Sequence, residues 1–207
     1  MKTELPFPRR AVVDTRLASD EIFDSVYEKP MRVLSKRHWT PVAVAARAAE
    51  LLVQAGATRI LDVGSGAGKF CLVGAMSTDA AFVGIDRREN LVDVARETAA
   101  RLGVTRATFV HANVTDFSFA DFDGVFLYNP FFEHVRQRLR PIDGTAERSR
   151  STYRLLVAAT LAKLRTLASP GVVVTFAGFG GRVPPDAFEF LGEEAMGNDW
   201  LEMWVKR

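Results

Sequence analysis

Five short apolar runs recur along the chain, each about the length of one strand, and most are separated by longer amphipathic stretches. The runs are residues 59–63, 81–85, 107–111, 124–128 and 172–176. The apolar residues between them mostly follow the spacing of one helix face. Strands that alternate with helices predict an α/β fold, with a parallel, doubly wound sheet and helices on both of its faces.

The expected helices have recognisable ends. Thr40, which precedes a proline, predicts a helix start with a capping hydroxyl, and Gly56 predicts the end of that helix. Asn90 is expected to cap a second helix, which Gly103 ends. A longer helix is expected over about residues 152–167.

The two ends of the chain have a different pattern. Residues 188–195 and 200–206 flank a Gly-Asn-Asp turn, and the second run alternates apolar and polar residues, which predicts an antiparallel hairpin. Added to the five alternating strands, this hairpin gives a mostly parallel seven-stranded sheet. Residues 1–39 are expected to form a short helical extension that covers the site, including a basic helix over residues 31–38, and residues 40–207 the main domain.

Composition narrows the class of protein. The 207 residues carry a formal net charge of +2, which is too small to indicate a nucleic-acid binder. No run of about 18 apolar residues predicts a membrane span, and the first residues lack the apolar run of a signal peptide. The single cysteine, Cys71, fits a reducing compartment. These features predict a soluble, cytoplasmic protein.

A glycine-rich loop follows the first expected strand directly. In the run Asp62-Val63-Gly64-Ser65-Gly66-Ala67-Gly68, every second residue from Gly64 is glycine, which permits positive φ and a close approach of the backbone to a ligand. A dinucleotide-binding fingerprint has its third glycine one position later, where this chain has Lys69. The mismatch argues against a nicotinamide-dependent oxidoreductase.

The loop resembles the first motif of the class I S-adenosylmethionine-dependent methyltransferases, an acidic residue followed by G-x-G-x-G. Asp62, Gly64, Gly66 and Gly68 fill every position of that motif. The resemblance implies that the loop, Ser65 included, contacts the methionine part of S-adenosylmethionine and that Asp62 organises it near the ammonium group. The alternative is a glycine-rich turn that binds no ligand.

Four further residues are candidates for the cofactor site. Asp86 ends the second expected strand, where a carboxylate accepts hydrogen bonds from ribose hydroxyls, or alternatively favours the N-terminus of a helix. The resemblance implies that Asn113 and Val114 contact the adenine, whereas an Asx turn is the local alternative for Asn113. Thr40 is expected to meet the cofactor carboxylate while Trp39 closes over the site; a helix cap and a packing tryptophan are the alternative.

The segment Tyr128-Asn129-Pro130-Phe131-Phe132 ends the fourth expected strand. It resembles the N-P-P-[YF] motif of methyltransferases that act on amine or amide nitrogen, with Phe131 in place of the second proline. The side-chain oxygen of Asn129 and the backbone carbonyl of Pro130 suit an acceptor NH2 group, and Tyr128 or Phe132 suits stacking on a planar or cationic acceptor. The alternative is an Asn-Pro turn with aromatic residues in the core.

These patterns predict an enzyme that methylates nitrogen. A protein side chain or a small molecule is the favoured acceptor, because the chain has little spare length for a domain that recognises a nucleobase. The arginine-rich residues 136–154 are expected to form a solvated helix face rather than a site for an acidic partner. No metal site is expected, since the histidines are isolated. A non-catalytic module that binds the cofactor or a partner is the alternative from another class.

Overall fold

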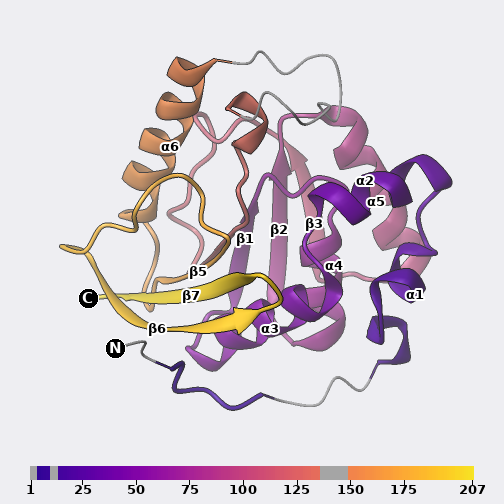
Figure 1. The fold of residues 1–207 in the computed structure, drawn as a ribbon, viewed down its shortest axis with the longest axis horizontal. Coiled ribbons are helices and arrows are strands. Elements are labelled where there is room, and N and C mark those ends of the chain that lie inside the picture. Colours follow the sequence, from indigo (N-terminus) through magenta and orange to yellow (C-terminus); the bar gives the residue numbers. More distant parts are fainter. Residues whose placement is uncertain (1–3, 10–13, 136–148) are drawn as a thin grey trace.

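The computed structural model describes residues 4–9, 14–135 and 149–207. Its seven strands form one sheet in the order β3-β2-β1-β4-β5-β7-β6 (Figure 1). Their bounds are β1 (Arg59–Val63), β2 (Ala81–Asp86), β3 (Ala107–His111), β4 (Gly124–Leu127), β5 (Val172–Phe176), β6 (Phe188–Met196) and β7 (Asp199–Lys206).

The first five strands are parallel, and β7 pairs antiparallel with both β5 and β6. The prediction of a mostly parallel seven-stranded sheet with a C-terminal antiparallel hairpin is therefore confirmed. The strand order reverses between β1 and β4, so that the loops after these two strands diverge to opposite faces. Such a point at the carboxyl edge of a parallel sheet is where ligands bind in open α/β folds.

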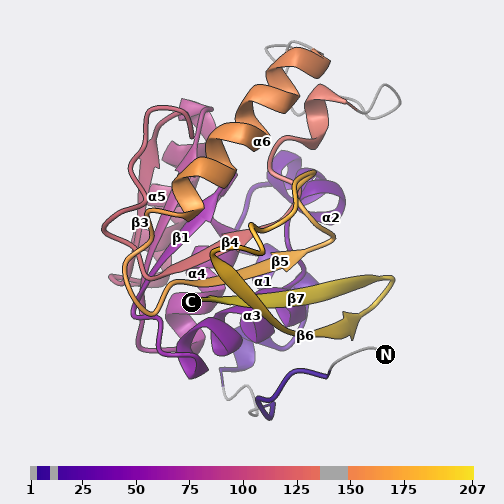
Figure 2. The ribbon, with the colours of Figure 1, turned by 90° about the vertical axis from the view of Figure 1, so that its left-hand side faces the viewer.

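Helices cover both faces of the sheet. Ile60 and Phe126 point into a core shared with α3, α4 and α5, whereas Leu61 and Val125 point into a second core shared with α6. Figure 2 views the molecule from the side of α6. No helix in the described part of the chain is long and apolar enough to cross a membrane. The helices are η1 (Thr15–Leu17), α1 (Asp20–Asp24), α2 (Lys29–His38), α3 (Val42–Gln54), α4 (Lys69–Ser77), α5 (Glu89–Leu102), η2 (Phe132–His134) and α6 (Arg150–Leu164).

The start of α3 differs from the sequence prediction. The helix begins at Val42, and the Thr40 hydroxyl does not cap it. Instead, the Asp20 carboxylate accepts a hydrogen bond from the Val42 backbone N–H at 2.9 Å. A carboxylate from α1 thus satisfies a free N–H group at the start of this helix, and Thr40 remains a buried residue beside the glycine loop.

The N-terminal helices are attached to the glycine loop by buried polar contacts. Lys69, at the start of α4, is 2% exposed. Its Nζ lies 2.6 Å from Asp20 Oδ1, 2.7 Å from Asp24 Oδ1 and 3.0 Å from Ser35 Oγ. The Tyr27 hydroxyl donates to the Ala67 carbonyl at 3.1 Å. The lysine that breaks the dinucleotide fingerprint therefore joins α1 and α2 to the loop.

Candidate cofactor and acceptor site

The glycine loop lies directly under two other segments. Gly64 and Gly66 adopt left-handed conformations, with φ of 77° and 54°. A Cβ atom at Gly64 would lie 2.9 Å from the Cβ of Pro130, and one at Gly66 would lie 3.1 Å from Nε1 of Trp39. The loop after β1, the predicted acceptor segment and the end of the N-terminal extension therefore meet at one place.

Gly68 has a different role from the other two glycines. A Cβ atom at this position would lie 2.5 Å from the ring of Phe109 and 2.9 Å from the Cβ of Ala95. Its missing side chain lets α4 start close against β3 and α5.

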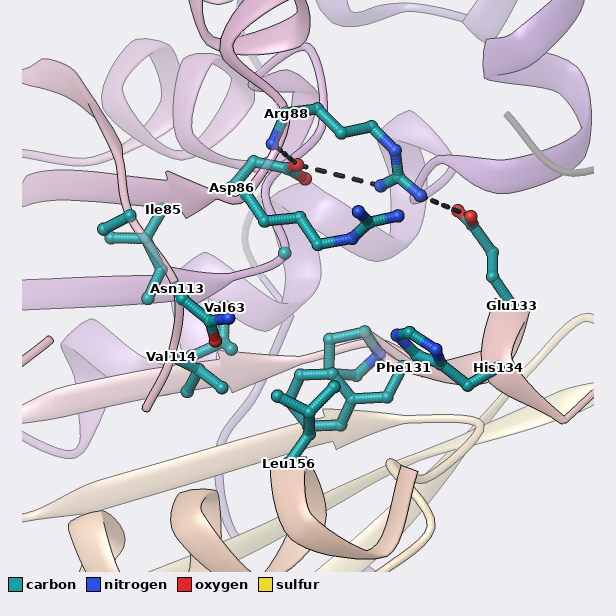
Figure 3. A pocket seen from close by; sticks show the side chains of 14 residues that line it. Val63, Ile85, Asp86, Arg88, Asn113, Val114, Phe131, Glu133, His134 and Leu156 are labelled. Carbon is teal, nitrogen blue, oxygen red and sulfur yellow. Dashed lines mark hydrogen bonds and ion pairs between the residues drawn. The ribbon is translucent and has the colours of Figure 1, made fainter. Parts of the chain in front are cut away.

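Two hollows open at the carboxyl edge of the sheet and share Val63 and Gly64. The hollow at the start of α4 is called the head hollow. The hollow at the end of β2 is called the β2 hollow (Figure 3). The head hollow is lined by His38, Trp39, Thr40, Asp62, Ser65, Lys69, Phe70 and Tyr128. The β2 hollow is lined by Ile85, Asp86, Arg87, Arg88, Ala112, Asn113, Val114, Pro130, Phe131, Glu133, His134 and Leu156.

Asp62 is the buried carboxyl group of the head hollow. Burial raises its pKa to about 8, the nearby Asp86 carboxylate acts in the same direction, and a hydrogen bond from Cys71 opposes them. The Sγ atom of Cys71 lies 3.7 Å from Asp62 Oδ2. Near neutral pH this carboxyl group is mostly protonated, and a cation beside it would favour its ionised form.

Two residues that line the head hollow carry a buried polar group with no hydrogen-bond partner in the described part of the chain. The indole Nε1 of Trp39 and the hydroxyl of Ser65 make no hydrogen bond to any described residue. Both side chains are more than nine-tenths buried. A buried donor that stays unpaired costs about 1–3 kcal/mol, so these groups indicate a ligand that accepts hydrogen bonds here.

Asp86 joins the end of β2 to its surroundings through both carboxylate oxygens. Oδ2 accepts from the Gly66 backbone N–H at 3.0 Å, and Oδ1 accepts from the Arg88 backbone N–H at 2.8 Å. The second bond holds the turn before α5. This helix begins at Glu89 and has no side-chain cap, so the prediction that Asn90 caps it is wrong. Each oxygen keeps a second lone pair for a ligand hydroxyl.

An ion pair crosses the β2 hollow. The Arg88 guanidinium pairs with Glu133 of η2 and lies 3.7 Å from Asp86 (Figure 3). The Arg88 side chain is 10% exposed and that of Glu133 is 17% exposed. This pair connects the loop after β2 with the segment after β4, and neither residue was predicted from the sequence. The only signal for Arg88 is its position just after Asp86.

Asn113 and Val114 lie together at one end of the β2 hollow (Figure 3). Val114 is buried, whereas Asn113 is exposed and its side-chain oxygen accepts from the Thr115 backbone N–H at 3.2 Å. The Asx turn considered as an alternative is therefore present. It is compatible with the predicted role, because the side-chain amide nitrogen is not used in this bond.

Asn129 adopts a left-handed conformation at the end of β4, with φ of 41°. Its side-chain nitrogen donates to the Ala177 carbonyl at 2.9 Å, and its backbone N–H donates to the Gly178 carbonyl at 2.9 Å. Ala177 also has a positive φ, of 52°. Two non-glycine residues with left-handed backbone conformations are thus joined by a hydrogen bond. Such backbone strain tends to occur at functional sites, which indicates one here.

The aromatic residues near Asn129 divide between the two hollows. Tyr128 lines the head hollow and packs on Phe176, and Phe131 is buried in the wall of the β2 hollow. Phe132 begins η2 and is not among the described residues that line either hollow. Phe131, which departs from the sequence motif, therefore lies closer to the predicted site than Phe132, which matches it.

Comparisons with known proteins give the family. A model of methyltransferase domains matches residues 55–177, more than half of the chain. The chain belongs to the class I S-adenosylmethionine-dependent methyltransferases. The matched region of this methyltransferase contains the glycine loop, Asp86 and Asn129, and it excludes the N-terminal extension with Trp39. The cofactor is S-adenosylmethionine.

Solved structures of the same fold accompany this match. An RNA methyltransferase from Salinibacter ruber in complex with S-adenosyl-L-homocysteine has 24% identity and a TM-score of 0.57, over 81% of this chain and 92% of that chain. TrmN from Thermus thermophilus has 18% identity and a TM-score of 0.60, over 84% of this chain and 51% of that chain. These likenesses show the fold of the methyltransferase. A comparison with curated protein sequences gives no match.

Proposed function

We propose that this methyltransferase transfers the methyl group of S-adenosylmethionine to a nitrogen atom held at Asn129 and Pro130. The observation that carries the proposal is the hydrogen bond from the Asn129 side-chain nitrogen to the Ala177 carbonyl. This bond holds the Asn129 amide in one orientation. The side-chain oxygen is then left to accept a hydrogen bond from an N–H group of the molecule that is methylated. The Pro130 backbone carbonyl lies near Gly64, where a Cβ atom would be 3.6 Å from it, and supplies a second acceptor beside the glycine loop.

The two hollows fit the two parts of the cofactor. An amino-acid head group needs donors for its carboxylate and an acceptor for its ammonium. The unpaired Trp39 Nε1 and Ser65 hydroxyl supply donors, Thr40 lines the same hollow, and Asp62 supplies the acceptor. The ribose then lies near Asp86, and the adenine near Asn113 and Val114. Asn113 supplies a polar group for the edge of the adenine, and Val114 supplies an apolar surface for its ring.

The reaction requires alignment more than acid or base chemistry. When bound, S-adenosylmethionine supplies an electrophilic methyl group on a sulfonium. The nitrogen lone pair forms the new bond to the methyl carbon as the carbon–sulfur bond breaks, and the acceptor then loses a proton to solvent. Asn129 and Pro130 orient the N–H groups so that the lone pair points along this line, which is the main source of acceleration in a positioned displacement.

A nucleobase amine is a second candidate acceptor within this function. The Salinibacter ruber protein of similar fold is an RNA methyltransferase. Four exposed cations of α2, Lys29, Arg32, Lys36 and Arg37, also favour a nucleic acid over the protein side chain or small molecule that the length of the chain suggested. The arginines among residues 136–148 lie outside the described residues, whereas Arg150 and Arg154 are exposed on α6.

The test is transfer of tritiated methyl from S-adenosylmethionine to separated pools of RNA, protein and small molecules. The proposal predicts label in one pool, with loss of transfer in Asn129→Gly but not of cofactor binding. Glycine tolerates the positive φ at this position and removes only the side chain. Full transfer by Asn129→Gly would remove Asn129 from the mechanism.

A further inference from the structure

The outer face of α2 carries four exposed cations, Lys29, Arg32, Lys36 and Arg37. The first three are spaced by three and four residues, so they lie along one face of the helix. None of the four has a hydrogen bond or ion pair from its side chain to another described residue. We call these four residues the basic face.

Some exposed arginines elsewhere are paired with carboxylates. Arg96 pairs with Asp93 at 3.0 Å, and Arg165 pairs with Asp186 at 2.7 Å through two hydrogen bonds. The four cations of the basic face make no such pair with a described carboxylate. Unneutralised cations along one helix attract a partner with repeated negative charge.

The basic face ends beside the site. His38 and Trp39, which follow Arg37 directly, line the head hollow. Burial lowers the pKa of His38, the charge of Glu133 opposes this, and the charges of Arg37 and Arg88 add to it. The end of α2 is therefore within electrostatic range of the ion pair that crosses the β2 hollow. Figure 1 shows α2 near the carboxyl edge of β2 and β3.

A further arginine of the β2 hollow has an unused hydrogen-bond donor. Nη2 of Arg87 is buried and has no partner among the described residues. The planar guanidinium suits phosphate, to which it donates two parallel hydrogen bonds. Arg87 thus adds a positive charge to the β2 hollow, which shares Val63 and Gly64 with the hollow where α2 ends.

We propose that the basic face binds the phosphate backbone of a single-stranded RNA whose acceptor nucleotide enters the site. This inference rests on the proposed nitrogen acceptor, and it names the substrate class of that site. An unpaired base enters a pocket without the cost of leaving a duplex, which favours a single-stranded region. The helix also supplies the recognition surface without any added domain.

The test is fluorescence anisotropy with a fluorescein-labelled, mixed-sequence RNA of about 20 nucleotides, a length that spans the helix and the site. The double variant Arg32→Glu/Lys36→Glu reverses two charges of the basic face. The control Arg165→Glu/Arg207→Glu reverses two charges at the amino edge of the sheet, where α6 ends and β7 ends. A duplex DNA and a polyglutamate peptide of similar charge are measured as competitors.

We expect the variant to bind the RNA at least about tenfold more weakly than wild type, and the control to bind within about twofold. Two lost phosphate contacts should also reduce the slope of log K against log salt by about 1.4, since each contact on a single strand contributes about 0.7. Equal affinities of variant and control would overturn the proposal. Tighter competition by the DNA or the peptide than by unlabelled RNA would also overturn it.

Calorimetry with S-adenosylhomocysteine separates this proposal from the proposed function. The variant should bind it with wild-type affinity, because its two substitutions lie outside both hollows. If RNA binds through the basic face but receives no methyl group on nitrogen, the result supports the RNA-binding surface and contradicts the proposed nitrogen acceptor.

Discussion

The Asp86 carboxylate accepts a hydrogen bond from the backbone N–H of Gly66 at 3.0 Å. This bond joins the end of β2 to the glycine loop after β1, at the point where the proposed ribose and methionine parts of the cofactor meet. Asp86 is 5% exposed, so water does not readily replace this contact. One carboxylate therefore holds the shape of the loop and, in our proposal, also contacts the ligand.

Asp86→Ala should accordingly reduce both stability and cofactor affinity. The N–H groups of Gly66 and Arg88 would lose their acceptor, which lowers the free energy of unfolding by about 1–3 kcal/mol. Calorimetry with S-adenosylhomocysteine should show a loss of about 1.5–3 kcal/mol in binding free energy. Asp79→Ala is the control, because that carboxylate is fully exposed. Lower stability with unchanged affinity would show that Asp86 holds the glycine loop and the turn before α5 but does not contact the cofactor.

Cofactor binding should strengthen as pH rises toward the pKa of Asp62. Burial raises that pKa to about 8, so the free protein holds a proton that an adjacent ligand ammonium displaces. Because the free state binds more protons than the complex, affinity should rise by up to about tenfold per unit between about pH 5.5 and about pH 7.5. Calorimetry in buffers of different ionisation enthalpy measures the proton released.

Asp62→Asn is the control for this pH dependence. It keeps the shape of the side chain and removes the titrating group, so binding should become weaker and nearly independent of pH over the same range. Unchanged pH dependence in this variant would assign the titration to another group.

Trp39→Phe should weaken S-adenosylhomocysteine binding by about tenfold, the effect of one lost hydrogen bond to a charged group. It should leave binding of 5′-methylthioadenosine, which lacks the amino-acid head group, within about twofold. The reason is that the unpaired Nε1 faces the head hollow. Trp200→Phe on the hairpin is the matched control. Equal losses for both ligands would make Trp39 a packing residue only.

Substitutions at Asn129 should separate conformation from chemistry. Asn129→Gly should bind cofactor normally and lose about 100-fold in methyl transfer. Asn129→Ala should additionally be less stable, because alanine is strained at a φ of 41°. Asn129→Asp removes the donor to the Ala177 carbonyl and places a carboxylate oxygen against it. We therefore expect the Asn129→Asp variant to be less active than wild type, although its side chain has the same shape. Thermal melts and rates of methyl transfer test the whole series of variants.

Local sequence patterns were sufficient for the sheet and for the glycine loop. Buried apolar runs produce the strands, and Gly64 and Gly66 are required by positive φ and by close neighbours. Contacts between distant segments were not predictable in the same way. The start of α3 is bound by Asp20 of α1 rather than by the Thr40 hydroxyl, because a carboxylate from a distant segment reaches it, and α5 has no side-chain cap from Asn90.

The charge of α2 shows the same limit. The sequence indicates a basic helix, but only the structure shows that its four exposed cations make no ion pair with a described residue and that the helix ends beside the site. The Arg88–Glu133 pair likewise joins segments that no spacing rule connects. Pairing between charged side chains depends on tertiary position, whereas strand and loop patterns depend on neighbours in the chain.

The position of the transferred methyl group tests the central claim most directly. RNA methylated by the protein with deuterated S-adenosylmethionine is digested to nucleosides, and the labelled nucleoside is identified by mass spectrometry. The account predicts a deuterated methyl group on a base nitrogen, and its absence from RNA treated with Asn129→Gly. A deuterated methyl group on a ribose oxygen or a base carbon would contradict the account.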